Sequence, residues 1–437
     1  MQATELRDAH GALTTSPETA LSGIDDFVLG FVCYHPRATK VLAVAEAHPE
    51  SALANLYAGF LWMFLERPEA VDQAAPWLER AKRVRGLNAR ERGLLALLSA
   101  WIGRDARASL AIADALCREY PEDLAALKLG QYHAFNLADP AAALRLAKYG
   151  RGCNEHSAPW HSMLAFGHEL NGQLDAAERA AFRALDLDEA EPWAHHALSH
   201  TYLERGALDE GRRFLSDRAD TWNELNSFMF THNWWHLALF ELAEGDATAA
   251  LRTFDDRVWG VQPDYSQDQI NAVSLLSRLE CAGVDVGDRW QRLRPHLEGR
   301  ADDVLQPFVT MHYLYGLTRS GSPGADNLLA LIESQVDGAF VPGNEALWSN
   351  VGIPCARGAH AHARGDHEQA ATLLLAVRER LPELGGSKAQ RDLFKQWLVH
   401  ALLKCSRLRE ARPLLAQRRK TEPDHPLIRF GDEGSCG

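Results

Sequence analysis

The sequence has few of the patterns that mark secreted, membrane-spanning or thiolate-metal proteins. Its seven cysteines are widely spaced and none forms a Cys-x-x-Cys pair, so neither a disulfide framework nor a thiolate zinc site is indicated. No run of roughly 18 apolar residues occurs. The opening residues, MQATELRDAH, lack the apolar segment of a signal peptide. We therefore expect a cytoplasmic protein with no membrane association.

Positively charged residues are fewer than negatively charged ones. Lysine and arginine total 46 residues against 59 aspartates and glutamates, a formal net charge of −13. An acidic surface repels phosphate backbones and anionic lipid headgroups. The composition therefore argues against nucleic acid and membrane surfaces as partners.

Strand patterns and common catalytic motifs are also missing. No segment alternates β-branched with polar residues, so we expect essentially no sheet. No dinucleotide-binding glycine motif, phosphate-binding loop or nucleophile-elbow motif occurs in the right context. Hydrophobic residues make up 46% of the chain. Without strands, they must form a core between helices.

What the sequence does contain is an internal repeat. Segments 159–185 and 193–215 each predict a helix, a glycine turn and a second helix, and the turn residues Gly172 and Gly206 are 34 residues apart. This is the tetratricopeptide period. Small residues such as Ala177 and Gly211 stand where two helices of a hairpin approach each other closely.

Looser copies of the hairpin extend the pattern along the chain, at 56–81, 88–117, 122–149, 232–255, 358–377 and 388–416. We therefore predict an all-α, tetratricopeptide-like α-solenoid of stacked antiparallel helical hairpins, curved around a concave surface rich in histidine and tryptophan. It is expected to form one array over 1–437, with the clearest repeats at 122–255, divergent hairpins at 260–345 and C-terminal hairpins at 346–423.

Histidine and tryptophan are abundant, with 19 and 12 residues, and they cluster in 193–200 and 231–236. Trp193, His196 and His200 fall on one helical row, next to a row in which His195 is expected to pack structurally. His232 and His236 repeat the i, i+4 spacing on the next hairpin. Because adjacent first helices lie side by side, the two histidine pairs are expected to share a hollow. Additional members would be His133, His168 and His312.

Several interpretations of this cluster remain open. His196, His200, His232 and His236 would suit a divalent metal, or histidine would act as a general acid or base. A polar binding pocket without chemistry, or half-buried histidines that only fill space, would show the same pattern. The His-Glu-x-x-His motif of metalloproteases is absent. The adjacent Trp234 and Trp235 point in different directions, so one is expected in the core and the other, assigned to Trp235, at the floor of the pocket.

The segment 384–394, LGGSKAQRDLF, predicts a Gly-Gly turn followed by a helix with Ser387 as its N-cap. Gln390, Arg391 and Asp392 open that helix. We include Arg391 and Asp392 among the candidate ligand-binding residues because their side chains can reach the same hollow.

Four segments, ALTTSPETA, HHALSHTYLERGALDEGRRFL, HNWWHLALFELAEGDATAAL and GGSKAQRDLF, resemble the tetratricopeptide repeat protein 38 family and its bacterial relatives. The resemblance runs over nearly the whole chain in the same order and is loose over 260–345. It implies an all-helical repeat fold and places His196, His200, His232, His236, Gln390, Arg391 and Asp392 in the characteristic stretches of the family. It implies no particular activity.

These observations favour a binding protein that holds a small molecule or peptide in a pocket built from Trp193, His196, His200, His232, Trp235 and His236, together with Arg391 and Asp392. One alternative is an enzyme that uses the same histidines for acid–base or metal-assisted chemistry. Another is a scaffold that docks a partner protein in the groove. No cofactor is predicted beyond the divalent metal of the enzyme alternative.

Overall fold

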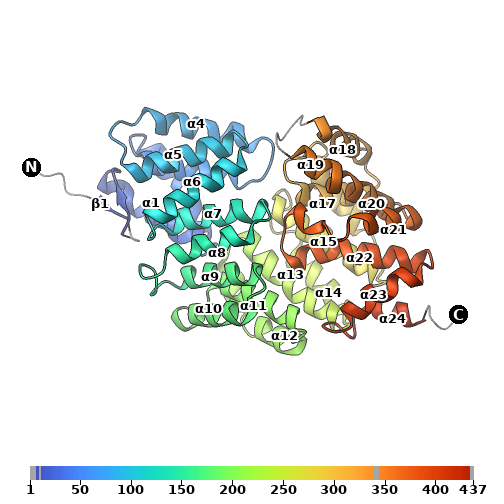
Figure 1. Cartoon of the computed structure of the whole chain (residues 1–437). Helices are drawn as coiled ribbons and strands as arrows, with labels where there is room; N and C mark the ends of the chain where they lie inside the picture. Colours follow the sequence, from blue (N-terminus) through green and yellow to red (C-terminus); the bar gives the residue numbers. More distant parts are fainter. Residues whose placement is uncertain (1–5, 9–10, 338–343, 434–437) are drawn as a thin grey trace, which may run out of the picture. The chain divides into compact units, whose positions relative to one another are not determined.

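Helices make up most of the part of the chain that the computed structural model describes, residues 6–8, 11–337 and 344–433 (Figure 1). The chain divides into two units. The first comprises Met1–Ala197 with Glu224–Asn226, and the second comprises Leu198–Asn223 with Ser227–Gly437. The division falls inside helix α11 (Pro192–Arg205).

The first unit is built from helical hairpins that follow one another in sequence. Besides the start of α11 it contains α1 (Glu18–Val32), α2 (Val41–Ala47), α3 (Ala52–Met63), α4 (Ala70–Arg83), α5 (Ala89–Ile102), α6 (Ala106–Glu119), α7 (Leu124–Asn136), α8 (Pro140–Tyr149), α9 (Ala158–Leu170) and α10 (Leu174–Leu187). Helices α3 and α4, α5 and α6, α7 and α8, and α9 and α10 pack as pairs, and each pair also contacts the next.

The second unit also contains sequential pairs. Its helices are the end of α11, α12 (Leu208–Ser216), α13 (Ser227–Ala243), α14 (Ala247–Thr253), α15 (Ser266–Cys281), α16 (Arg289–Glu298), α17 (Pro307–Arg319), α18 (Gly324–Glu333), α19 (Glu345–Leu347), α20 (Ile353–Ala363), α21 (His367–Val377), α22 (Lys388–Lys404), α23 (Leu408–Arg418) and α24 (Pro426–Glu433). The divergent region 260–345 thus supplies two helical pairs, α15 with α16 and α17 with α18.

The predicted hairpin turns lie where the sequence pattern placed them. Gly172 and Gly206 have φ angles of 68° and 70°, the left-handed conformation that glycine adopts without strain. Close helix packing explains Gly211, because a Cβ atom there would lie 2.4 Å from the ring of Phe240. Pro68 lies in the turn before α4, since that helix begins at Ala70.

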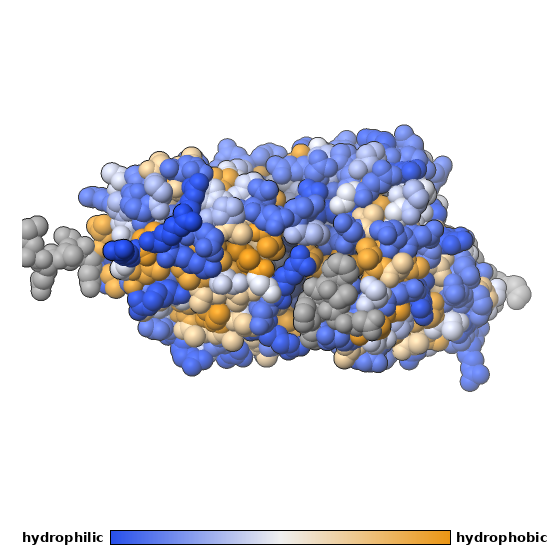
Figure 2. Space-filling view, turned by 90° about the horizontal axis from the view of Figure 1, so that it is seen from above, coloured by the Kyte–Doolittle hydropathy of each residue, from blue (hydrophilic) through white to orange (hydrophobic). Residues whose placement is uncertain are grey.

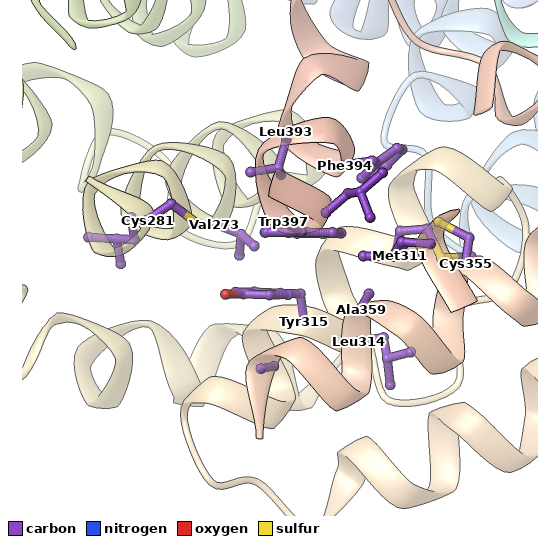
Figure 3. Packing of buried hydrophobic residues seen from close by; sticks show 14 of the residues in the cluster. Val273, Cys281, Met311, Leu314, Tyr315, Cys355, Ala359, Leu393, Phe394 and Trp397 are labelled. Carbon is purple, nitrogen blue, oxygen red and sulfur yellow. The ribbon is translucent and has the colours of Figure 1, made fainter. Parts of the chain in front are cut away.

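Helix α22 contacts one helix of the second unit that is far from it in sequence. It packs against α20 and also against α15, more than a hundred residues earlier. The indole N–H of Trp397 on α22 donates to the Ser277 hydroxyl on α15 over 2.6 Å. Figure 3 shows the resulting core, in which the rings of Trp397 and Tyr315 lie flat against each other with centroids 4.4 Å apart.

This return contact goes beyond the neighbour-to-neighbour stacking of a simple solenoid, in which each repeat touches only the next. The all-α class and the sequential helix pairs are confirmed. The tetratricopeptide solenoid, its concave surface and a single array over the whole chain stay predictions.

The one sheet among the described residues has two strands of two residues, β1 (Leu6–Arg7) and β2 (Leu13–Thr14), paired antiparallel. It is tied to the first unit by polar contacts. Asp8 forms an ion pair with Arg90 at 3.1 Å, and the backbone N–H of Thr15 donates to Glu91 over 2.7 Å. The described part of the N-terminal segment therefore packs against the start of α5.

None of the described helices is both long and apolar enough to cross a bilayer. Hydrophilic side chains cover most of the face shown in Figure 2, and hydrophobic residues show between them.

Candidate functional site

A cavity of about 380 Å³ with both charged and apolar lining residues lies within the second unit. Side chains from α11, α13, α15, α22 and α23 and from the segment before α24 line it. We call it the α15–α22 cavity. It reaches the surface at Lys388, whose side chain is 61% exposed and pairs with Glu204.

The inner wall of the α15–α22 cavity carries a buried arginine, Arg278, which is 1% exposed. Its guanidinium donates to the Ser274 hydroxyl over 3.2 Å and to the Ala389 carbonyl over 2.6 Å. It lies over the ring of Trp235, with the guanidinium carbon 5.5 Å from the ring centroid, an attractive cation–π geometry. Burial lowers the pKa of Arg278 to about 10, so the group still carries its charge at neutral pH.

No carboxylate of the described residues lies within 4.0 Å of Arg278, and its buried Nε–H has no hydrogen-bond partner among them. The other two fully buried arginines differ. Arg90 pairs with Asp8 and Asp123, and Arg300 lies 3.5 Å from Asp303. Asp392 and Glu422 attract Arg278 only from beyond ion-pair distance. Because a buried charge without a direct partner is unfavourable, Arg278 is the buried group in this cavity that an anion would stabilise most.

A second arginine in the cavity is fully compensated. Arg418 donates to both carboxylate oxygens of Asp392, over 2.6 and 2.7 Å, and to Glu422 over 2.5 Å. Burial alone would lower the pKa of Arg418, but these two carboxylates outweigh burial and raise it. In turn, burial would raise the pKa of Asp392, while Arg418 and Arg278 hold it well below its usual value.

The balance of charge in the cavity is opposite to that of the whole chain. Its lining contains five cationic side chains, Arg278, Lys388, Lys395, Arg418 and Lys420, and three carboxylates, Glu204, Asp392 and Glu422. With neutral histidines the lining carries a net positive charge in a protein of net charge −13. The cavity therefore attracts anions, although the protein as a whole repels them.

Two of the predicted ligand-binding residues, His200 and Asp392, line this cavity. His200 also contacts a third, His236, with the two Nε2 atoms 3.2 Å apart, so one ring donates to the other. The predicted approach of α11 and α13 through these histidines is therefore present within the second unit. His236 is fully buried behind His200.

His232 and Trp235 lie deeper in the second unit and do not line the cavity. The His232 Nδ1 atom is 3.0 Å from Asn271 Oδ1, and its ring stacks on Trp235 with centroids 5.2 Å apart. Asn271 in turn donates to Thr231, which donates to Asp268. Burial lowers the pKa of His232 to about 4 and raises that of Asp268 to about 7. This network satisfies the hydrogen-bonding groups of these buried side chains. Trp235 contributes to the site indirectly, because its ring packs against the Arg278 guanidinium.

Trp193 and His196 belong to the first unit. Their rings stack with centroids 4.1 Å apart, and Trp193 also packs on Tyr34 and Phe166. Neither residue lines the α15–α22 cavity.

Arg391 does not line the cavity either, because its guanidinium donates to the carbonyls of Gly385 and Gly386 in the turn before α22. The predicted N-cap at Ser387 is confirmed. Its hydroxyl accepts from the Gln390 N–H, and the Gln390 side chain accepts from the Ser387 N–H, a full capping box. This cap starts α22 in the position from which Asp392 reaches Arg418.

The additional histidines lie elsewhere. His133 is buried in the first unit, where burial lowers its pKa to about 3, and His168 contacts Gln173 over 2.7 Å. His312 is 1% exposed, and its Nδ1–H donates to the Phe308 carbonyl over 2.9 Å. His195, expected to be structural, is fully buried and contacts the Glu189 carbonyl over 2.9 Å.

Sequence reasoning missed Arg278, Arg418 and Glu422. Arg278 lies in the divergent region, on a helix in which almost every other residue is uncharged. A lone arginine among Leu275, Leu276 and Leu279 was the available signal. Its partners on α22 could not be inferred, because the α15–α22 contact joins segments more than a hundred residues apart.

No protein-family model matches the chain. The functional argument therefore depends on the residues and geometry of the α15–α22 cavity.

Proposed function

We propose that this chain is a binding protein whose second unit holds a small anionic molecule, or the carboxylate of a peptide, in the α15–α22 cavity. The observation that carries the proposal is Arg278, a buried guanidinium with no carboxylate within 4.0 Å among the described residues and with an unpartnered Nε–H. A carboxylate or phosphate oxygen supplies the charge and the acceptor that this group lacks.

The surroundings support an anion as the ligand. Lys395 and Lys420 add positive charge to the lining, and neither forms an ion pair with a described residue. Arg418 is held in place by Asp392 and Glu422, which fixes the cavity wall and leaves Arg278 as the anchoring group. Apolar side chains from Leu203, Leu239 and Val399 provide contact for the uncharged part of a ligand.

The test uses acetate and inorganic phosphate as probes and thermal unfolding of the full chain as the readout, with ionic strength held constant by chloride. A ligand that binds only the folded state raises the unfolding midpoint as its concentration increases. At a hundred times its Kd, it increases the free energy of unfolding by about 2.7 kcal/mol. We expect wild-type protein to respond to at least one probe and Arg278→Met to lose that response.

Arg300→Met is the matched control, because Arg300 is equally buried in the same unit but lies outside the cavity. It controls for the general stabilisation that phosphate gives any protein. The Arg300→Met variant is expected to be less stable than the wild type. The anion should nevertheless raise its unfolding midpoint by the same amount as that of the wild type. An anion response of the same size in Arg278→Met would refute the proposal.

A second candidate function is acid–base chemistry in the same cavity, favoured by one observation. The His200 ring lines the cavity and contacts His236 at 3.2 Å, an arrangement that fixes its orientation and gives it a partner for proton exchange. A panel of ester, amide and phosphoester substrates would reveal it. Turnover that His200→Gln abolishes while anion binding persists would establish an enzyme; absence of turnover across the panel would leave the binding function alone.

A further inference from the structure

We propose that a separate group of side chains in the second unit, Cys281, His362 and His400, is a binding site for a borderline transition-metal ion such as zinc. One donor atom of each residue lies within 4.8 Å of the donor atoms of the other two. A thiolate and two imidazoles form a ligand set that zinc prefers. We call these three residues the Cys-His-His cluster; none of them lines the α15–α22 cavity.

Three helices bring the cluster together. Cys281 is the last residue of α15, His362 lies near the end of α20, and His400 lies in the last turns of α22. Helix α22 packs against both of the others. In Figure 3, Cys281 lies on the side of the Trp397–Tyr315 stack towards which the Tyr315 hydroxyl points, and Cys355 lies on the opposite side. The ligands therefore come from rigid elements at the edge of a packed core.

The two imidazoles already meet at their nitrogen atoms. His362 Nε2 lies 2.9 Å from His400 Nδ1, so one ring donates its proton to the other. Two nitrogens bound to one tetrahedral zinc, each at about 2.0–2.1 Å, are roughly 3.3 Å apart. A small outward movement of the rings is therefore enough for an ion to take the place of the proton between them.

The proton balance of binding is simple. The Cys281 thiol releases its proton to solvent and binds as the thiolate. His362 binds through Nε2 and carries its ring proton on Nδ1, while His400 binds through Nδ1 and carries its ring proton on Nε2. Each imidazole stays neutral, and the cluster releases one proton for each ion bound.

An outer partner for His362 is already in place. The Tyr315 hydroxyl lies 3.1 Å from His362 Nδ1, where it can accept the ring N–H that metal binding requires there. Tyr315 is itself fixed by its parallel stack on Trp397, at an interplanar angle of 4°. Metal-binding histidines almost always have such a hydrogen-bond partner on the second nitrogen, because it sets the tautomer and the ring orientation.

The cluster also has a route to solvent and a candidate for the fourth ligand position. Cys281 and His362 are buried, whereas His400 is only partly buried. The ring of His367, also partly buried, lies with its centroid 5.3 Å from that of His400 and 5.6 Å from that of His362. His367 or a water molecule can therefore complete a tetrahedral site.

The experiment uses the full chain, stripped of metal with a chelator and titrated with Co²⁺ as an optical probe for zinc. We expect one equivalent to bind and to give both the thiolate-to-cobalt charge-transfer absorption and the visible bands of tetrahedral cobalt. Zn²⁺ should displace the cobalt and bleach both signals. The His200–His236 pair contains no sulfur and cannot produce the charge-transfer absorption.

Cys281→Ser is expected to abolish the charge-transfer absorption, and Cys355→Ser is its matched control. Cys355 is equally buried in the same core, and it is not part of the cluster. His400→Asn, at a partly exposed position with less risk to folding, should weaken cobalt binding at least about tenfold. Wild-type protein that shows no charge-transfer absorption would overturn the proposal, as would a Cys281→Ser variant that keeps it. Neither result bears on the anion response of Arg278.

Discussion

Two buried arginines, one in each unit, are held in different ways. In the first unit Arg90 donates to Asp123 over 2.6 Å, to the Tyr57 hydroxyl over 3.0 Å and to the Leu13 carbonyl over 3.2 Å, and it also pairs with Asp8. In the second unit Arg278, equally buried, has one hydroxyl and one carbonyl partner. The comparison shows how to separate a structural charge from a candidate binding charge: the first is saturated within the chain, and the second is not.

The largest loss of stability is expected when the saturated arginine is removed. Arg90→Met would leave Asp8 and Asp123 buried without their cation, which is expected to cost about 3–5 kcal/mol of stability. Arg278→Met leaves Asp392 with its direct partner Arg418 and should cost at least about 2 kcal/mol less. Thermal unfolding followed by circular dichroism would measure both variants. Equal losses would mean that the two arginines play the same role.

Acid is expected to destabilise the second unit more than the first, because the second unit holds more buried histidines in neutral form. Burial lowers the pKa of His232 and of His312 to about 4, against an ordinary value of 6.5. The unfolded chain therefore binds more protons than the folded chain between pH 6.5 and pH 4. Stability contributed by these neutral rings is complete above pH 6.5 and falls as the pH drops towards 4, by roughly 1.4 kcal/mol per pKa unit for each ring.

The check is the unfolding midpoint of His312→Gln measured from pH 7 to pH 4. The variant should lose stability at neutral pH and depend less on pH than the wild type. His156→Gln, at an exposed position, should follow the wild-type curve. A His312→Gln curve parallel to that of the wild type would show that this ring does not contribute to acid sensitivity.

A smaller effect is expected at Tyr315, which touches the Cys-His-His cluster through His362. Tyr315→Phe keeps the stack on Trp397 and removes only the hydroxyl, so cobalt affinity should fall about tenfold while the charge-transfer absorption persists. Loss of that absorption would indicate that Tyr315 is itself a ligand.

The smallest effects should come from a pair of capping boxes, one in each unit, among the helix starts that the structure describes. Asn88 with Glu91 starts α5, and Ser387 with Gln390 starts α22. Ser387→Ala should cost about 1 kcal/mol. Asn88→Ala should cost more, because Asn88 also donates to the Leu13 carbonyl over 3.2 Å and so holds the N-terminal segment. Thermal unfolding of the two variants would rank them; the reverse order would mean that this contact contributes little.

Local features of this protein were determined by its sequence. The glycine turns at Gly172 and Gly206, the small residue Gly211 beneath Phe240 and the Ser387 cap depend on backbone conformation and on neighbours one hairpin away. The i, i+4 histidines on α11 and α13 likewise predicted the contact of His200 with His236. Helical geometry fixes such relationships within a few residues, so pattern alone is sufficient to find them.

The tertiary structure alone decided which polar side chains meet. The α15–α22 contact brings Arg278 beside Asp392 and Arg418, and together with α20 it brings Cys281 to His362 and His400. The sequence offered no spacing rule for residues more than a hundred positions apart. Their meeting depends on how whole helices pack, because the free energy of that packing comes from apolar area spread over many residues and not from the few polar groups that it brings together.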